Sequence, residues 1–252
     1  ETWEWNGVRW QQRASGEPPS RGGAVMAYDA KHQSIIMFGG YTGNSLILGD
    51  TWSWDGQKWS QLHVSGPTPR SGHATAHDVA HQVTVLAGGV NLSGDFETWT
   101  WNGENWLWRS NEGPPSRTDN LLAYDAARHV AVLFGRGIDP DNGETWEWDG
   151  SQWTFRDVNT PPGRIYADMV FDSWRNVAVL FGGTAHYPNA LPSETWEWNG
   201  ASWSLRTTSG PTGRYQHCMA FDESRGVTVL FGGRSSGGPN PDWHRETWEW
   251  DG

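Results

Sequence analysis

Short apolar segments alternate with polar turns along the whole chain. Within residues 166–203, the continuous apolar run Val177–Phe181 ends at Gly182-Gly183. A later segment, Thr195–Trp198, alternates aromatic and polar positions, and Trp203 begins another short segment. Segments of four to seven residues that are rich in branched and aromatic side chains are typical of β-strands. Together with a short run at the start of this stretch, the pattern predicts four strands.

A turn signal follows the alternating segment in every unit. Asn-Gly or Asp-Gly favours positive φ at both central positions of a two-residue hairpin turn. We therefore expect the third and fourth strands of each unit to form a tight hairpin. The pairs stand at positions 6–7, 55–56, 102–103, 149–150, 199–200 and 251–252.

The alternating segment recurs along the chain. Glu-Thr-Trp-Glu-Trp or a close variant begins at residues 1, 50, 97, 144, 194 and 246, at intervals of 49, 47, 47, 50 and 52 residues. A period of this size is the mark of a repeat protein. Four antiparallel strands in about 49 residues make one propeller blade. The sequence predicts an all-β protein, a single β-propeller domain over residues 1–252.

The order of motifs within the repeat resembles the kelch repeat. An Arg precedes a strand, a second strand ends in Gly-Gly, and an aromatic-x-aromatic strand is followed by Asp/Asn-Gly and a further Trp. The resemblance implies a β-propeller but no particular activity, because kelch propellers include oxidases, specifier-type plant enzymes and protein-binding modules. The doublets are Gly39-Gly40, Gly88-Gly89, Gly182-Gly183 and Gly232-Gly233, and the third repeat departs with Gly135-Arg136-Gly137.

The number of blades depends on how the ends meet. Naming the strands of a blade a to d, the chain begins with strands c and d over residues 1–13, continues with four complete blades, and ends with a, b and a further c over 246–250. We favour five blades, with the N-terminal c–d pair completing the blade that the C-terminal a–b pair begins, which removes open edges. The alternative is part of a six- or seven-bladed ring. One copy of strand c is spare, and it can stay unpaired, compete with its twin, or cause self-association.

Tryptophan fills fixed places in the repeat. Of the 20 Trp residues, only Trp108, Trp174 and Trp243 lie outside three recurring positions. The two Trp of strand c are two residues apart, so both point to the same face of the sheet. We expect them to fill the gaps between blades.

Loops that vary on a regular scaffold usually carry function. The b–c loops differ in length and content, so we expect the functional surface on their face, around the mouth of the central channel. Aromatic side chains stack on sugars and anchor peptides. Four are candidate contacts here: Tyr41, Tyr166, Tyr187 and Trp243.

One arginine per repeat precedes strand a on the same face. A guanidinium group suits carboxylates and other anions, so these residues are candidate ligand contacts. Each repeat also carries an acid at the start of strand c, and pairing between the two is the simpler alternative, as the kelch resemblance also implies. The arginines are Arg21, Arg70, Arg117, Arg164 and Arg214.

Four histidines are candidate metal ligands. His73 and His217 stand three residues after the repeat arginine, and His186 and His244 lie in the two longest b–c loops. Imidazoles that converged on one point would hold a transition metal. No tight zinc-type spacing is present, so ordinary hydrogen-bonded histidines are the favoured alternative.

The composition and charge of the chain limit the kinds of partner that it can bind. The net charge of −11 argues against nucleic acid or an anionic membrane as the main partner. The single cysteine, Cys218, excludes an intrachain disulfide, and no apolar stretch approaches the roughly 20 residues that span a bilayer. The chain begins with Glu rather than Met, from which we expect that a leader or an earlier part of a longer protein has been removed, and we expect an extracellular, cell-surface or periplasmic location. No phosphate-loop or other cofactor motif occurs.

These observations favour a non-catalytic binding propeller of bacterial type that needs no cofactor and engages a protein segment or a glycan. One alternative is an enzyme that uses His73, His217, Asp119, Asp168 or Tyr166 at the channel mouth. The other is a self-assembling structural module that uses the spare strand.

Overall fold

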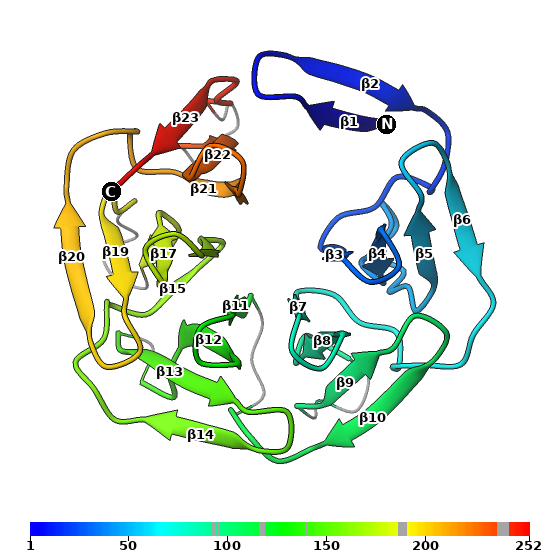
Figure 1. Cartoon of the computed structure of the whole chain (residues 1–252), viewed down its shortest axis with the longest axis horizontal. Helices are drawn as coiled ribbons and strands as arrows, with labels where there is room; N and C mark the ends of the chain where they lie inside the picture. Colours follow the sequence, from blue (N-terminus) through cyan, green and yellow to red (C-terminus); the bar gives the residue numbers. More distant parts are fainter. Residues whose placement is uncertain (92–93, 95, 116–118, 140, 186–190, 236–241) are drawn as a thin grey trace.

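Five antiparallel sheets form blades around a central channel in the computed structural model of the chain, and two short two-stranded sheets accompany them (Figure 1). The model describes residues 1–91, 94, 96–115, 119–139, 141–185, 191–235 and 242–252. These residues contain no helix, and therefore none long and apolar enough to cross a bilayer. The predicted all-β, five-bladed propeller is confirmed.

Four of the sheets have four strands each. Blade 1 comprises β3 (Val25–Asp29), β4 (Ser34–Phe38), β5 (Thr51–Trp54) and β6 (Trp59–Leu62). Blade 2 comprises β7 (Ala74–Asp78), β8 (Val83–Ala87), β9 (Thr98–Trp101) and β10 (Trp106–Ser110). Blade 3 comprises β11 (Leu121–Asp125), β12 (Val130–Arg136), β13 (Gly143–Trp148) and β14 (Trp153–Arg156). Blade 4 comprises β16 (Asp168–Asp172), β17 (Val177–Phe181), β19 (Thr195–Trp198) and β20 (Trp203–Thr207), and the short pair β15 (Arg164–Ile165) and β18 (Thr184–Ala185) extends beside it.

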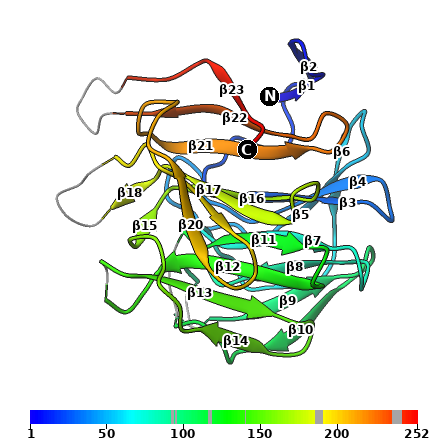
Figure 2. The same cartoon turned by 60° about the vertical axis from the view of Figure 1, so that its left-hand side comes forward.

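The first strand of each blade lines the channel and the fourth lies on the outer rim (Figure 1). Figure 2 shows β15 and β18 projecting from one face of the ring, on the side where β22 and β23 also end and begin. This face carries the b–c connections, as expected, and we call its central opening the channel mouth.

The core of the ring lies between the blades. The second Trp of strand c is almost fully buried against the preceding blade, as at Trp101, Trp148 and Trp198. The strand-d Trp also reaches back: Trp106 Nε1 donates to Thr51 Oγ1 of the preceding blade at 2.9 Å, and its ring meets Phe38 edge-on at 5.4 Å. The same indole-to-threonine bond joins Trp59 to Thr2, Trp153 to Thr98 and Trp203 to Thr145. The predicted role between blades is confirmed for the second Trp of strand c. The first Trp is less buried, and Trp3 and Trp248 are 48% and 39% exposed.

The c–d hairpins are looser than the expected two-residue turns. In the first, Trp5 pairs with Trp10, so residues 6–9 form a four-residue loop. Asn6 Oδ1 accepts the N–H groups of Val8 and Arg9 at 3.0 and 2.9 Å, and only Gly7 has a positive φ, of 89°. The expectation was wrong because the Asn or Asp side chain itself satisfies the loop amides, which makes a longer loop stable.

The a–b turns on the opposite face share another device. An Asp at the end of strand a accepts the N–H groups of the turn and also binds the side chain three residues later. Asp29 binds His32 and Asp172 binds Arg175, each at 2.7 Å. Arg175 continues to Glu197 of strand c at 2.5 Å. These bonds stabilise the turns on the face that lies away from the channel mouth.

The last blade differs from the expected closure. It contains β21 (Tyr215–Asp222), β22 (Val227–Arg234) and β23 (Thr247–Trp250), while β1 (Thr2–Trp5) and β2 (Trp10–Ala14) form a separate two-stranded sheet. The C-terminal copy of strand c therefore takes the place beside β22 that we assigned to the N-terminal copy. Residues 1–5 and 246–250 have the same sequence, so both fit this place, and the copy that directly follows β22 in the chain holds it.

The buried strand-c indoles provide a test of the interblade core. Trp148 is only 2% exposed and packs among residues of blades 2 and 3. We expect Trp148→Ala to lower the free energy of unfolding by roughly 3–5 kcal/mol, because it removes a buried aromatic and leaves a cavity. Urea denaturation measures this, with the half-exposed Trp108→Ala as control. A loss below about 1 kcal/mol would contradict an interblade role.

Candidate functional site

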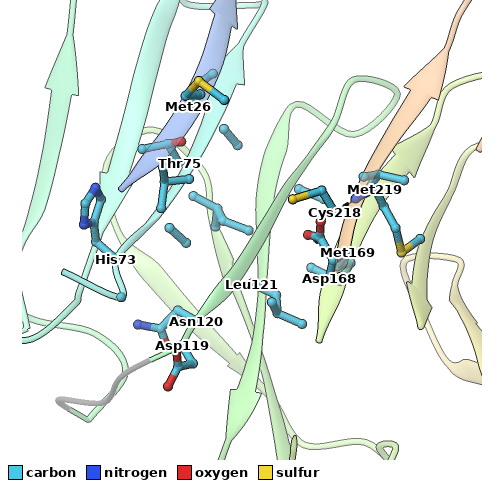
Figure 3. A pocket seen from close by; sticks show the side chains of 18 of the residues that line it. Met26, His73, Thr75, Asp119, Asn120, Leu121, Asp168, Met169, Cys218 and Met219 are labelled. Atoms are coloured by element: carbon cyan, nitrogen blue, oxygen red, sulfur yellow. Dashed lines mark hydrogen bonds between the residues drawn. The ribbon is translucent and has the colours of Figure 1, made fainter. Parts of the chain in front are cut away.

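The inner strands enclose a channel whose cavity measures about 980 Å³. Its wall combines apolar residues such as Leu121 and Met169 with His73, Asp119 and Asp168 (Figure 3). Most of the wall is repetitive strand, so the residues that break the repeat decide what the channel can bind.

One such position lies two residues after the repeat arginine. In blades 1 and 2 it is Gly23 and Gly72, with φ of 62° and 63°. In blades 3 to 5 it is Asp119, Tyr166 and Gln216, with φ of 57°, 56° and 57°. A non-glycine residue in this left-handed region costs of order 1 kcal/mol or more, and such strain gathers at functional sites. All five residues border the channel or its mouth.

Backbone bonds between blades impose this conformation. The N–H of Gly72 donates to the carbonyl of Gly23 at 3.2 Å, and that of Asp119 donates to the carbonyl of Gly72 at 3.0 Å. The N–H of Gln216 donates to the carbonyl of Tyr166 at 2.9 Å. The side chains at this position are thus held on a rigid rim, which suits a binding site.

An aromatic and guanidinium stack supports one side of the mouth. The rings of Tyr166 and Tyr215 lie 6.1 Å apart. The guanidinium of Arg234 lies 4.6 Å from the Tyr215 ring and 5.6 Å from the Trp243 ring. Contacts of this kind stabilise by a fraction of a kcal/mol to about 2 kcal/mol each. Tyr166 and Trp243 remain 39% and 61% exposed, so both can still meet a ligand.

Tyr41 enters the mouth from blade 1. Its backbone exchanges hydrogen bonds with Gly22 at 2.8 and 2.9 Å. The ring covers Gly22, where an added Cβ would lie 2.8 Å from Tyr41 Cζ, so a larger residue there would displace the Tyr41 ring. The charge of Asp119 is the largest cause that raises the pKa of Tyr166, followed by burial and the proximity of Tyr41. Three of the predicted ligand contacts, Tyr41, Tyr166 and Trp243, therefore lie at the mouth; Tyr187 lies outside the described residues.

The repeat arginines serve the scaffold. Arg21 forms a two-pronged pair with Asp50 at 2.6 and 2.9 Å, and Arg164 bonds to the carbonyl of Gly182 at 3.2 Å and to Glu194 at 3.3 Å. Arg70 pairs with Glu97 and Arg214 with Glu246 in the same way, and Arg70, Arg164 and Arg214 are almost fully buried. The pairing alternative thus describes four arginines, and an anion trap does not fit them because their charges are already matched. Arg117 lies outside the described residues.

The candidate metal ligands do not come together. His73 and His217 sit in blades 2 and 5, which are not neighbours in the ring, and each ring meets a phenylalanine of the preceding blade, Phe38 or Phe181, edge-on at 5.6 Å. His244 lies 3.3 Å from Glu246, and His186 is outside the described residues. Within the described ranges no three His, Cys, Asp or Glu side chains form a group that would hold a metal ion. The geometry favours the packing alternative for His73 and His217.

Burial changes the pKa values of both histidines. Desolvation, with a smaller contribution from the charge of Arg70, lowers the pKa of His73 to about 3. Desolvation and Arg214 lower the pKa of His217 to about 4. Both imidazoles are therefore neutral in the folded protein at neutral pH.

Asp168 faces the channel from blade 4. Its carboxylate accepts the N–H of Met169 at 2.8 Å and that of Met219, in blade 5, at 2.7 Å, and so joins two blades. Burial raises the pKa of Asp168 to about 6. Figure 3 shows the thiol of Cys218 beside it, and burial and this neighbour raise the pKa of Cys218 to about 11. A thiol with so high a pKa is a poor nucleophile at neutral pH.

The fold has a counterpart among solved structures. The chain is similar to YjhT, with a TM-score of 0.75 and 14% sequence identity over 96% of this chain and 84% of that one. At this identity the likeness shows the propeller fold alone. No family model matches the sequence, and no curated protein matches it. The kelch resemblance therefore stays a prediction.

Removing one repeat arginine tests its role in the scaffold. We expect Arg164→Ala to lower the free energy of unfolding by roughly 2–4 kcal/mol, because it leaves a buried carbonyl and Glu194 without their donor. The control is Arg206→Ala, which removes a half-exposed arginine 3.2 Å from Glu197 and should cost less than about 1 kcal/mol. Equal losses in urea denaturation would contradict the assignment.

The buried histidines predict a pH dependence of stability. The unfolded chain takes up protons on these histidines below its ordinary pKa of about 6.5, whereas the folded protein does so only near pH 4 and below. Each histidine therefore removes up to about 1.4 kcal/mol per pH unit as the pH falls from about 6.5 to about 4.

The double variant His73→Asn/His217→Asn should lose less stability over this range, since Asn120 occupies the same place in blade 3. Urea denaturation at pH 7, 5.5 and 4.5 measures the difference between the two proteins. Parallel pH profiles would show that the two histidines do not control acid stability.

Proposed function

We propose that the protein is a non-catalytic binding propeller that holds the end of a neutral glycan at the channel mouth. The observation that carries the proposal is the position two residues after the repeat arginine, where Asp119, Tyr166 and Gln216 replace glycine in a left-handed conformation. Interblade hydrogen bonds offset the strain at these positions, and a role in ligand contact explains why three polar or aromatic side chains stand where glycine would fit without strain.

The chemistry of the mouth suits a sugar. Tyrosine rings offer faces on which the C–H groups of a pyranose stack, and Tyr41 and Tyr166 stand exposed on the rim. The carboxylate of Asp119 accepts hydrogen bonds from hydroxyl groups, and the amide of Gln216 both donates and accepts them. The repeat arginines are paired with acids, which disfavours a ligand selected by its negative charge. A cell-exterior location, as proposed from the sequence, would give access to such ligands.

The enzyme alternative depends on Asp168, the carboxyl group with the most raised pKa in the channel. Both bonds of that carboxylate go to backbone amides of blades 4 and 5. An interblade tie accounts for its position without a reaction, which supports binding over catalysis.

Titration calorimetry with neutral oligosaccharides selected on a glycan array tests the proposal. We expect Tyr166→Ala and Asp119→Asn each to weaken binding at least about tenfold, because each removes a stacking face or a charged acceptor worth over 1 kcal/mol. Tyr28→Ala is the matched control, since Tyr28 is an exposed tyrosine at the far end of the inner strand of blade 1. Binding that survives the triple change of Tyr41, Tyr166 and Trp243 to alanine would contradict the proposal, as would binding of peptides alone.

At the same site, a side chain that improves ligand binding should lower the free energy of unfolding. We expect Gln216→Gly to weaken glycan binding while leaving the free energy of unfolding unchanged or raising it by up to about 1 kcal/mol, because glycine adopts this φ without strain. A clear loss of stability would show that the Gln216 side chain serves the fold instead.

A further inference from the structure

The rim of the channel mouth carries a side chain over four of its five positions. In blades 3 to 5 the position two residues after the repeat arginine is occupied by Asp119, Tyr166 and Gln216. In blade 1 the ring of Tyr41 covers Gly23, where an added Cβ would lie 3.0 Å from Tyr41 Cε1. In blade 2 the position is Gly72, which has no side chain of its own. The rim is therefore lowest in blade 2.

The residue that covers the rim in blade 1 is replaced by a smaller one in blade 2. Ser71 and Val90 form the same isolated β-bridge as Gly22 and Tyr41, so Val90 stands in the place of Tyr41. A valine side chain lacks the ring with which the tyrosine covers the adjacent glycines, and Val90 is 43% exposed. We call the gap over Ser71, Gly72 and Val90 the blade 2 notch.

The channel cavity of about 980 Å³ extends into the blade 2 notch. All three residues of the notch belong to the wall of the cavity. The described residues that occupy the place of Ser71 in the other blades do not line the cavity; they are Gly22, Ile165 and Tyr215. The cavity is therefore asymmetric, and it opens across the rim over blade 2.

Backbone hydrogen bonds hold the floor of the notch in place. Ser71 and Val90 exchange two bonds, of 3.2 and 2.8 Å. Gly72 donates its N–H to the carbonyl of Gly23 at 3.2 Å, and its own carbonyl accepts the N–H of Asp119 at 3.0 Å. The notch is thus part of the framework that joins blades 1, 2 and 3. A groove that is already formed in this way lowers the cost of ordering an extended ligand.

The notch offers the groups that bind a neutral sugar. The Tyr41 ring stands beside Ser71, since an added Cβ at Gly23 would meet both, at 3.0 and 3.4 Å. Tyr41 is 44% exposed, so its face is open to the C–H groups of a pyranose, and the Ser71 hydroxyl both donates and accepts hydrogen bonds. The arginine that precedes them, Arg70, is buried and paired with Glu97, so it adds no unmatched charge.

We propose that the protein binds a linear neutral glycan by its end, with the terminal unit in the channel mouth and the following units in the blade 2 notch. This second subsite, formed by Tyr41, Ser71 and Val90, rests on the proposed function of the mouth. A chain bound through an internal unit would have to cross the rim at a second position, where side chains stand. The notch therefore selects the ends of chains.

Titration calorimetry with the full chain tests the notch. The probes are free linear sugars of one to four glucose, galactose or mannose units, of the series that binds on a glycan array. We expect the affinity to rise about tenfold or more from the monosaccharide to the trisaccharide, because the added units contact the notch. Gly72→Tyr places a ring in the notch and should lower the trisaccharide affinity to about that of the monosaccharide, which itself should change less than about twofold. Tyr166 has a φ of 56° at the equivalent position, against 63° for Gly72, so the backbone accepts a tyrosine.

Three further variants make the test specific. Val90→Trp narrows the notch without changing Gly72 and should lower the trisaccharide affinity about fivefold or more, which decides the matter if Gly72→Tyr does not fold. Gly56→Tyr is the matched control and should leave binding unchanged. Gly56 also has a positive φ, of 90°, but it lies in a c–d hairpin on the opposite face, and an added Cβ meets nothing within 4 Å. Tyr166→Ala should weaken monosaccharide and trisaccharide binding alike, because it removes a contact to the terminal unit.

The outcomes separate the notch from the proposed function of the mouth. If the unchanged protein binds no neutral sugar, the function and the notch are both wrong. If the affinity does not increase with chain length, or if trisaccharide binding survives both Gly72→Tyr and Val90→Trp, only the notch is wrong and binding of the terminal unit stands. An equal loss of monosaccharide and trisaccharide binding in a folded Gly72→Tyr variant would also overturn the notch, because the blade 2 position would then serve the terminal unit.

Discussion

The reach of each strand-d indole into the preceding blade sets the geometry of the whole ring. The indole nitrogen bonds to one threonine, the ring lies against an aromatic side chain, and in two junctions the backbone approaches so closely that only glycine fits. A buried indole contributes a few kcal/mol by area, and this contribution is repeated from blade to blade. Each strand-d indole contacts the preceding blade, so these contacts all run in the same sense around the ring. The packing of a blade is therefore complete only when the next blade has folded against it.

The strands and their packing could be predicted because both follow from a short repeated pattern. Two Trp at a spacing of two must share a face, and a period of about 49 residues leaves room for four strands. The loops were harder to predict from the sequence. The Asn or Asp before Gly predicts a turn, but whether its side chain caps a four-residue loop depends on hydrogen-bond geometry that composition does not specify. The Asp at the end of strand a recurs in every blade, and that signal would have identified the bonded turns on the far face.

The site was only partly visible in the sequence. Arginine is equally suited to a ligand and to an internal carboxylate, and only the distances to Asp50, Glu194 and Glu246 decide between them. The histidines drew attention by breaking the repeat, yet the more informative break lies one residue earlier, where Gly23 and Gly72 give way to other residues. The closure of the ring was beyond prediction for a different reason: identical segments have identical preferences, so no pattern can choose between residues 1–5 and 246–250.

The position two residues after each repeat arginine also bears on how such a protein can acquire new specificities. Its torsion angles are imposed by amide bonds from adjacent sheets, whatever the side chain is. A substitution there changes one point on the circumference of the opening and leaves the frame unaltered, at a local energetic penalty that does not spread to the other four points. For the proposed binding site, this means that a substitution in one blade can change the contacts offered to a ligand without altering the other blades.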